Sequence, residues 1–322
     1  MDRQNIKIVC IGAAVQDVFL RGKIFAPQHE DGEDVEEFKL GSKNEVDEVI
    51  FSTGGGATNA AVTFARQGLH ACYMGKVGKD LAGTAVLDAL HQDQVDTSLV
   101  TVSPQSGTGY SVLLLAPNGE RTILTYRGAS THYELHPKDF HDLVADWFYV
   151  TSLDGNFEVL ETIFEYALKH QIKIAMNPGH KELEHAHRLK DLLPKLEILS
   201  MNADEAKQLF GHESAAEAVR SANEHIPYVV ITDGPGGVTA GDRTKIITAG
   251  VYEDVKVVDR TGAGDAFSSG FVAMIAVGDT IEQAIRFGSA NSTSVVGQIG
   301  AKAGILRAGA HLHDMPMRLE NF

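Results

Sequence analysis

The sequence predicts an α/β protein with a mostly parallel central sheet, helices on both faces and a small β lid. Three observations support this fold class. Short apolar runs alternate with amphipathic stretches through most of the 322 residues, and such alternation implies a parallel sheet covered on both faces. Glycine-rich turns follow several of the apolar runs. Two β-rich stretches interrupt the alternation, which predicts a lid.

The net charge and the apolar runs of the sequence argue against a nucleic-acid-binding protein and against a membrane protein. The net charge is −15, so binding to nucleic-acid phosphates through a basic surface is not expected. No apolar run reaches the roughly 18 residues that a membrane span needs, and the first residues lack a signal-peptide pattern. The two cysteines, Cys10 and Cys72, lie in apolar segments, as expected for buried free thiols in a reducing compartment. We therefore expect a cytoplasmic protein that binds neither nucleic acid nor a membrane.

The first core strand leads into a lid segment. Residues 6–11 form a continuous apolar run that predicts a buried strand. Asp17 follows at the mouth of this strand, where ligands of open α/β sheets bind. Residues 18–53 are acidic and broken by glycines and a proline. We interpret them as a protruding β segment or lid, with a flexible acidic insertion as the alternative.

A glycine-rich turn, Gly54-Gly55-Gly56, opens the next helix, which should run to about Gln67. Glycines let a ligand approach the backbone closely. Asn59, one turn into the helix, is placed to offer its amide to a hydroxyl-rich ligand. Three glycines alone are weak evidence for a site. A strand is expected at 70–75 and a helix at 82–90.

Residues 109–116 and 121–126 are β-branched-rich runs joined by Pro-Asn-Gly-Glu, a strong hairpin pattern. A hairpin within an alternating chain predicts a second piece of the lid. The sequence therefore divides into a core of residues 1–17, 53–105 and 129–322 and a lid of residues 18–52 and 106–128. Arg127, at the end of the hairpin, is placed either to contact a substrate or to lie on the surface.

The second half of the chain alternates regularly between strands and helices. Strands are expected at 146–150, 172–176, 196–200 and 227–232. Helices are expected near 156–169, 182–193, 203–210 and 214–224. A two-stranded piece at 238–240 and 245–248 precedes helices at about 265–277 and 279–296. Residues 306–322 show no clear period.

The stretch Asp-Arg-Thr-Gly-Ala-Gly-Asp, residues 259–265, is a tight turn that leads into a helix. The first N–H groups of a helix have no internal partner and favour anions. Asp265 would repel a phosphate bound there. A carboxylate in this position suits a general base that acts on a hydroxyl attacking phosphorus. Capping of the helix is the alternative role.

Other candidate sites are weaker. Glu205, one turn into the helix that Asn202 begins, is placed to hold Mg²⁺ through water, and a capping box is a compatible alternative. The histidine pairs at 185/187 and 311/313 lack cysteine or carboxylate partners at ligand spacing, so surface histidines are expected. No Gly-x-Gly-x-x-Gly fingerprint follows the first strand, which argues against a dehydrogenase.

Four of these motifs together resemble the ribokinase-like (PfkB) sugar and nucleoside kinases. Residues 259–265 are similar to the family's carboxy-terminal signature, and residues 54–59 to its amino-terminal signature. Asn202-x-x-Glu205 and Thr232-x-Gly234-x-x-Gly237 are similar to its nucleotide motifs. The four occur in the family's order across roughly residues 6–305. The resemblance implies a three-layer α/β/α fold with a mostly parallel central sheet and a β-strand lid.

The resemblance also implies an activity, the transfer of the γ-phosphate of ATP to a primary hydroxyl of a sugar. Asp265 would be the base, and the amides of Gly262, Ala263 and Gly264 would form the anion hole. Substrate hydroxyls would be held by Asp17, Gly55, Gly56, Asn59 and Arg127. The nucleotide site would include Asn202, Glu205, Thr232, Gly234, Gly237 and Ser289.

The cofactors and partners that the resemblance implies are Mg²⁺ held through water by Glu205 and, in some members, a monovalent cation such as K⁺. The cation would lie near Asp259, Thr261 and Gly300, and the lid would form a homodimer. Ribose is in doubt as the substrate, because Gly56 stands where ribokinases proper carry a lysine. The alternatives are a nucleoside kinase and a non-catalytic sugar or nucleotide sensor on the same fold.

Overall fold

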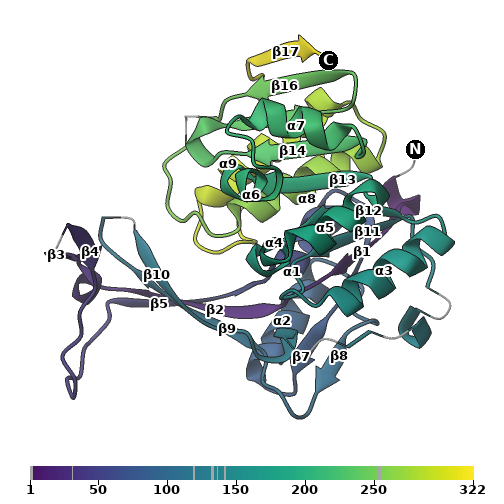
Figure 1. The fold of residues 1–322 in the computed structure, drawn as a ribbon. Helices are drawn as coiled ribbons and strands as arrows, with labels where there is room; N and C mark the ends of the chain where they lie inside the picture. Colours follow the sequence, from purple (N-terminus) through teal and green to yellow (C-terminus); the bar gives the residue numbers. More distant parts are fainter. Residues whose placement is uncertain are drawn as a thin grey trace.

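The computed structural model describes residues 3–30, 32–118, 120–131, 134–135, 137–140, 143–252 and 255–322. Its centre is a nine-stranded sheet (Figure 1). In spatial order the strands are β17 (Met317–Asn321), β16 (Lys245–Ala249), β15 (Val238–Gly241), β14 (Tyr228–Thr232), β13 (Ile198–Asn202), β12 (Lys173–Asn177), β11 (Trp147–Thr151), β1 (Lys7–Ile11) and β6 (His70–Met74). The strands from β6 to β14 run parallel, and β15, β16 and β17 continue the sheet antiparallel.

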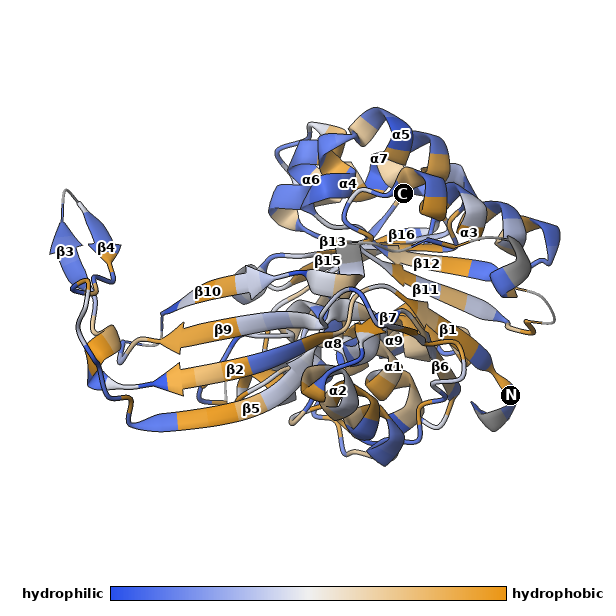
Figure 2. Cartoon of the chain, turned by 90° about the horizontal axis from the view of Figure 1, so that it is seen from below, coloured by the Kyte–Doolittle hydropathy of each residue, from blue (hydrophilic) through white to orange (hydrophobic). Residues whose placement is uncertain are grey.

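Helices cover both faces of this sheet (Figure 2). One face carries α1 (Gly56–Arg66), α2 (Leu81–Gln92), α8 (Ala263–Ala276) and α9 (Ile281–Val296). The other carries α3 (Phe157–Lys169), α4 (His180–Glu184), α5 (Ala186–Leu192), α6 (Ala203–Phe210) and α7 (Ala215–Asn223). The predicted three-layer α/β/α fold is therefore confirmed.

Side-chain alternation along each strand supplies both cores. In β1, Ile8 and Cys10 join the core on the α1/α8 face, whereas Val9 and Ile11 join the core on the α3/α6 face. Successive strand residues point to opposite faces, so a strand with helices on both sides is apolar throughout. This is why the central strands appear in the sequence as continuous apolar runs rather than alternating ones.

A second, four-stranded sheet extends from the core as the lid (Figures 1 and 2). Its strands, in spatial order, are β10 (Arg121–Tyr126), β9 (Gly109–Leu115), β2 (Val15–Arg21) and β5 (Glu48–Gly54). The lid sheet takes in Asp17, which pairs in register with Ser111 of β9 and Ser52 of β5. The expected β lid is therefore present, whereas the division of the chain into domains stays a prediction.

Two small sheets complete the described structure. The pair β3 (Gln28–Glu30) and β4 (Glu33–Val35) lies at the far end of the lid, within the acidic segment. The pair β7 (Lys76–Gly78) and β8 (Thr101–Ser103) lies next to the core. No helix in the described ranges is long and apolar enough to cross a membrane.

One local expectation is wrong, and one strand has no counterpart in the sequence pattern. The helix expected over 182–193 is broken at His185, whose φ of −109° and ψ of 44° lie outside the helical region, into α4 and α5. Residues 317–321 form β17, which pairs with the edge of the nine-stranded sheet. This strand is mostly exposed, so its sequence shows no apolar alternation. Gly119, in the predicted hairpin turn, lies outside the described residues.

Candidate active site

The first turn of α8 presents open backbone N–H groups. The helix begins at Ala263, after Gly262 in the left-handed conformation (φ 78°), and no side chain caps it. The N–H of Ala263 makes a long turn bond to Arg260 O (3.3 Å). The N–H groups of Gly264 and Asp265 have no partner among the described residues, and Gly264 faces open space. This turn can therefore bind an anion through the backbone.

The carboxylate of Asp265 is oriented next to this turn. Nδ2 of Asn59 donates to its Oδ2 at 2.8 Å. A Cβ built on Gly56 would lie 3.4 Å from its Oδ1, so the turn before α1 touches the acid. Burial raises the pKa of Asp265, opposed by the Asn59 hydrogen bond and the positive charge of Lys302. A carboxylate fixed in this way, with raised proton affinity, suits a general base.

The amide oxygen of Asn59 is available to a ligand. This Oδ1 is buried and has no hydrogen-bond partner in the described part of the chain. Buried polar atoms are nearly always satisfied in proteins. A ligand hydroxyl that donates to Asn59 would meet this need, which supports the prediction that Asn59 binds substrate.

Asp17 lies against the same glycine turn from the lid side. It is 5% exposed, and burial raises its pKa to about 6, opposed by the charge of Lys302 and a hydrogen bond with Ser111. A Cβ on Gly54 would overlap Oδ2 of Asp17. Gly55 has φ 100°, and a Cβ there would overlap the carbonyl of Ala13. Both positions therefore require glycine for close packing, whatever else they do.

Lys302 also belongs to this site, although the sequence analysis does not predict it. Its side chain is buried, and its Nζ donates to Thr53 O (2.8 Å), Thr53 Oγ1 (3.1 Å) and Thr58 Oγ1 (2.9 Å). The residue lies 37 positions after Asp265, in a loop of small residues. The weak signal available was a single lysine within Gly-Ala-Lys-Ala-Gly, where a solvated loop would be the ordinary expectation.

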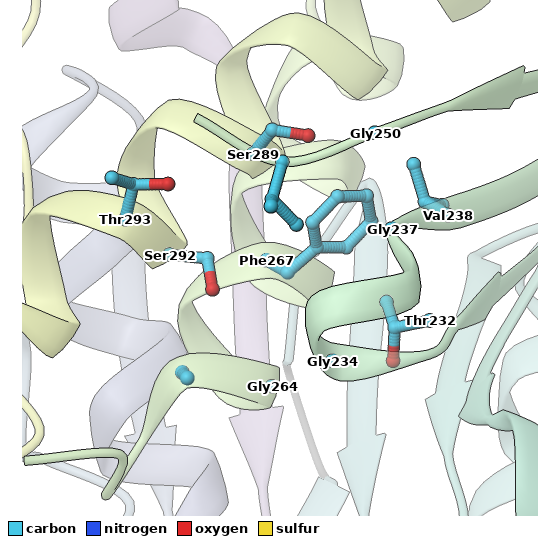
Figure 3. Close-up of a pocket in the computed structure, with 12 residues that line it drawn as sticks. Thr232, Gly234, Gly237, Val238, Gly250, Gly264, Phe267, Ser289, Ser292 and Thr293 are labelled. Carbon is cyan, nitrogen blue, oxygen red and sulfur yellow. The ribbon is translucent and has the colours of Figure 1, made fainter. Parts of the chain in front are cut away.

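A pocket of about 110 Å³ opens beside the α8 turn, between β14, β15, α8 and α9 (Figure 3). It brings together four residues predicted for the nucleotide, Thr232, Gly234, Gly237 and Ser289, with Ala263 and Gly264 of the predicted anion hole. The remaining lining residues were not predicted and are Val238, Gly250, Val251, Phe267, Ser292 and Thr293. Ser292 and Thr293 lie one turn beyond Ser289 on α9, so helical spacing could have suggested them.

Asn202 and Glu205 form a capping box at the start of α6. Oδ1 of Asn202 accepts from Glu205 N (2.9 Å), and Oε2 of Glu205 accepts from Asn202 N (2.9 Å). Neither residue lines the described pocket. Burial raises the pKa of Glu205, opposed by the Asn202 hydrogen bonds, while the negative charges of Asp204 and Asp265 raise it further. The capping interpretation is confirmed, and the nucleotide and Mg²⁺ roles stay predictions.

The three residues predicted for a monovalent cation lie together. Oδ1 of Asp259 accepts from Thr261 N (3.0 Å) and Thr261 Oγ1 (2.7 Å), and its Oδ2 accepts from Gly300 N (3.0 Å). Asp259 is 4% exposed. It has no lysine, arginine or histidine ion pair in the part of the chain that the structure describes. A buried carboxylate without a charged partner is costly, so this site fits a cation.

Arg127 pairs with the core. Its NH1 lies 3.5 Å from Oδ1 of Asp154, and Nζ of Lys181 lies 3.1 Å from Oδ2 of the same residue. Asp154 follows the end of β11, and Thr151 of that strand lies against Gly56. Arg127 is therefore near the acceptor side of the site, but its side chain is 58% exposed. Contact with a substrate stays a prediction.

Comparison with known proteins shows the family to which the chain belongs. Residues 6–307 match the family described as pfkB family carbohydrate kinase. The chain is 30% identical to the ribokinase of Haemophilus influenzae over 78% of this chain and 83% of that one. It is 27% identical to the guanosine-inosine kinase of Exiguobacterium acetylicum over 90% and 94%. The structure of Arabidopsis thaliana ribokinase complexed with ribose and ATP shares the fold (TM-score 0.77, 20% identity, 94% and 96% covered).

These similarities establish both the class of enzyme and the family. It is a phosphotransferase that acts on a hydroxyl group, of the ribokinase-like sugar and nucleoside kinases. The chain belongs to the pfkB family of carbohydrate kinases.

Proposed function

We propose that the protein transfers the γ-phosphate of ATP to a primary hydroxyl of a sugar, with Asp265 as the general base. One observation carries this proposal: the carboxylate of Asp265, oriented by Asn59, lies in the same first turn of α8 as Gly264, which lines the pocket. A base and an anion site in one turn serve a hydroxyl that attacks a phosphoryl group. The ribose and ATP in the Arabidopsis relative support the choice of substrates.

The residues divide the work of the reaction. Asp265 accepts the proton of the attacking hydroxyl as it bonds to phosphorus and the ADP oxygen departs. The amides of Gly262, Ala263 and Gly264 stabilise the charge on the phosphoryl oxygens. The Ala263 amide must give up its long bond to Arg260 O to do so. Asp17 and Asn59 accept hydrogen bonds from other acceptor hydroxyls and fix the attacking one, and such positioning supplies much of the rate.

Two cations fit residues of this site. Glu205, a partly buried carboxylate close enough to feel the charge of Asp265, fits a Mg²⁺ that keeps most of its water. Bound Mg²⁺ would neutralise charge on the nucleotide phosphates. The buried Asp259 fits a monovalent cation such as K⁺ beside the anion-binding turn, with Thr261 and Gly300 next to it.

A nucleoside kinase is the second candidate. The similarity to a guanosine-inosine kinase covers 90% of this chain. The Burkholderia thailandensis nucleoside kinase, solved in complex with inosine, shares the fold with a TM-score of 0.73. The pentose hydroxyls of a sugar and of a nucleoside would meet the same Asp17 and Asn59, so these residues serve both candidates.

A panel of acceptors separates the candidates. ADP release from Mg-ATP would be measured with ribose, fructose, inosine and guanosine, beside thermal-shift titrations of the same compounds, because a ligand stabilises the fold that it binds. The proposal expects the highest kcat/KM with a sugar. A higher value with a nucleoside would select the second candidate. Binding without any ADP release would contradict both and indicate a sensor.

We also propose a homodimer formed through the lid of a cytoplasmic enzyme. The lid face opposite Asp17 exposes an apolar set of Val49, Phe51, Leu124 and Tyr126. Exposed apolar patches of this kind mark interaction surfaces. Phe51, on the edge strand β5, is 69% exposed, so Phe51→Glu should convert a dimer to a monomer in sedimentation experiments. A wild-type monomer at all concentrations would contradict the proposal.

A further inference from the structure

Three consecutive residues after α9 join separate parts of the site. The N–H of Gly300 donates to the buried Asp259. Ala301 packs against Gly262 of the anion-binding turn, where any Cβ on that glycine would overlap it. Lys302 reaches across to the other glycine turn, the one before α1. This short loop therefore contacts both the phosphate side and the acceptor side.

The Lys302 ammonium is held by three oxygen atoms that flank the Gly54–Gly56 turn. Thr53, near the end of β5, supplies its carbonyl and hydroxyl oxygens, and Thr58, in the first turn of α1, supplies its hydroxyl. The Thr58 hydroxyl in turn donates to Gly54 O at 2.7 Å. Three N–H groups meet three acceptors, which is the full donor capacity of an ammonium group. Lys302 therefore ties together the two elements between which the turn lies.

The same ammonium interacts electrostatically with two carboxylates of the acceptor side, Asp17 and Asp265. Gly54 touches Asp17, and Gly56 touches Asp265, so the turn that Lys302 holds separates the two acids. The charge of Lys302 lowers the pKa of both carboxyls against the effect of burial. Burial lowers the pKa of Lys302 itself to about 7, and the two acids oppose that shift. The protonation state of each of the three groups therefore depends on the charges of the other two.

The backbone at Lys302 is fixed independently. Arg66 makes a two-point ion pair with Asp93 (2.7 and 2.8 Å) and donates from NH1 to the carbonyls of Lys302 (2.8 Å) and Ile305 (2.9 Å). The charge of Arg66 is therefore engaged with Asp93, while its hydrogen bonds hold the loop against α1. A side chain of 7% exposure on a fixed backbone has little freedom to move.

We propose that Lys302 is a positioning residue of the acceptor side, which holds the Gly54–Gly56 turn in place and supplies the counter-charge for Asp17 and Asp265. The inference rests on the proposed function, because Asp17 would bind the hydroxyl acceptor and Asp265 would deprotonate it. It predicts a division of effects: loss of Lys302 should weaken use of the acceptor and leave nucleotide binding intact.

The test compares Lys302→Met with Lys245→Met, which removes an ion-paired lysine (2.5 Å to Glu282) from β16. The acceptor is whichever of ribose, fructose, inosine and guanosine the wild type uses best. We expect Lys302→Met to raise the acceptor KM at least about tenfold and to shift the acid limb of kcat/KM upward by about one pH unit. The Kd for ADP should stay within about twofold, and Lys245→Met should behave as wild type.

Two further variants separate the effect of the Lys302 charge from the effect of the cage, which is the set of three Thr53 and Thr58 oxygens around its ammonium. Lys302→Arg keeps the charge, so its acid limb should stay at the wild-type pH even where KM rises. Thr58→Val removes one oxygen of the cage and should raise the acceptor KM without moving the limb. If Lys302→Met does not fold, Thr58→Val decides: a wild-type acceptor KM in that variant overturns the proposal. Equal losses of acceptor and nucleotide binding in Lys302→Met would also overturn it, because that pattern indicates general damage.

A wild type that uses no acceptor would contradict the proposed function, and the inference is then judged on Tm. The raised pKa of Asp17 makes the free energy of unfolding fall as pH rises until that carboxyl ionises. Loss of Lys302 removes the positive charge that lowers the pKa of Asp17, so this fall extends to higher pH. The Tm gap between the two proteins should therefore widen from about pH 6 to about pH 8. A constant gap overturns the inference.

Discussion

The two sides of the site are built from different chemical groups. The pocket beside α8 is lined by glycines, small hydroxyl residues and apolar side chains, with no charged side chain among its described lining residues (Figure 3). The acceptor side instead brings together the buried or partly buried charges of Asp17, Asp265 and Lys302. One side uses backbone dipoles, and the other uses ionisable groups.

This difference has a physical consequence. Backbone N–H groups at a helix start carry fixed partial charges that no pH change removes. Buried carboxylates and ammonium groups hold charges that depend on one another and on pH. The acceptor side should therefore respond to pH and to variants that remove charge. The nucleotide side should respond to variants that fill the space in front of its backbone N–H groups.

The largest effect is expected from Asp265→Asn. The amide cannot take the proton of the acceptor hydroxyl, so kcat should fall by about 10²–10⁴-fold. Binding of ADP should be unchanged or slightly stronger, because a negative charge beside the phosphate site is lost. Steady-state kinetics and calorimetric titration with ADP would measure both. Asp314→Asn, at an exposed ion pair with Arg286, is the control, and near-normal turnover in Asp265→Asn would remove that residue as the base.

The next effect is that of pH on the acceptor side. The pKa of Asp17 is raised to about 6. Its ionised form accepts hydroxyl hydrogen bonds on both oxygens, whereas protonation turns one oxygen into a donor. At saturating nucleotide, kcat/KM for the acceptor should fall by about tenfold for each pH unit below about pH 6. Asp17→Asn should lower kcat/KM and abolish this limb. A limb that persists in Asp17→Asn would assign it to another group, such as Asp265.

The contrast also explains what the sequence could predict. The nucleotide side was largely predictable, because a turn that exposes backbone needs glycine, and glycines at fixed spacing are visible in the chain. Thr232, Gly234, Gly237 and Ser289 all line one pocket as expected. The position of Asp265 beside an open helix turn was predicted for the same reason.

The acceptor side was only partly predictable, because its charges come from distant segments. Asp17 and Asn59 stood near recognisable turns, whereas Lys302 joins Thr53 and Thr58 across more than two hundred residues of chain. Local pattern holds no information on such a contact. The same limit applies to β17, whose exposed residues pair with β16 without any apolar period.

A smaller effect is expected from adding one methyl group on the nucleotide side. A Cβ on Gly264 would meet no protein atom within 4 Å, so Gly264→Ala should keep or slightly raise Tm, since alanine favours helix. The Kd for ADP should rise about tenfold, because the methyl occupies space before the open amides. Gly262→Ala is the contrast: its φ of 78° and overlap with Ala301 should lower Tm. Unchanged ADP binding in a stable Gly264→Ala would place the phosphate elsewhere.

The smallest effect is expected at the rim of the acceptor side, from Arg127→Met. Arg127 and Lys181 both pair with Asp154, and both side chains are about half exposed. Exposed ion pairs contribute about 0–1 kcal/mol, so kcat/KM for the acceptor should fall by less than about fivefold. Lys181→Met is a matched control because it weakens the same cluster from the core side. A loss of kcat/KM confined to Arg127→Met indicates that Arg127 contacts the acceptor. Equal losses in both variants indicate that the two ion pairs only hold the Asp154 loop. A loss of about a hundredfold would show that charge at the rim matters as much as the buried charges.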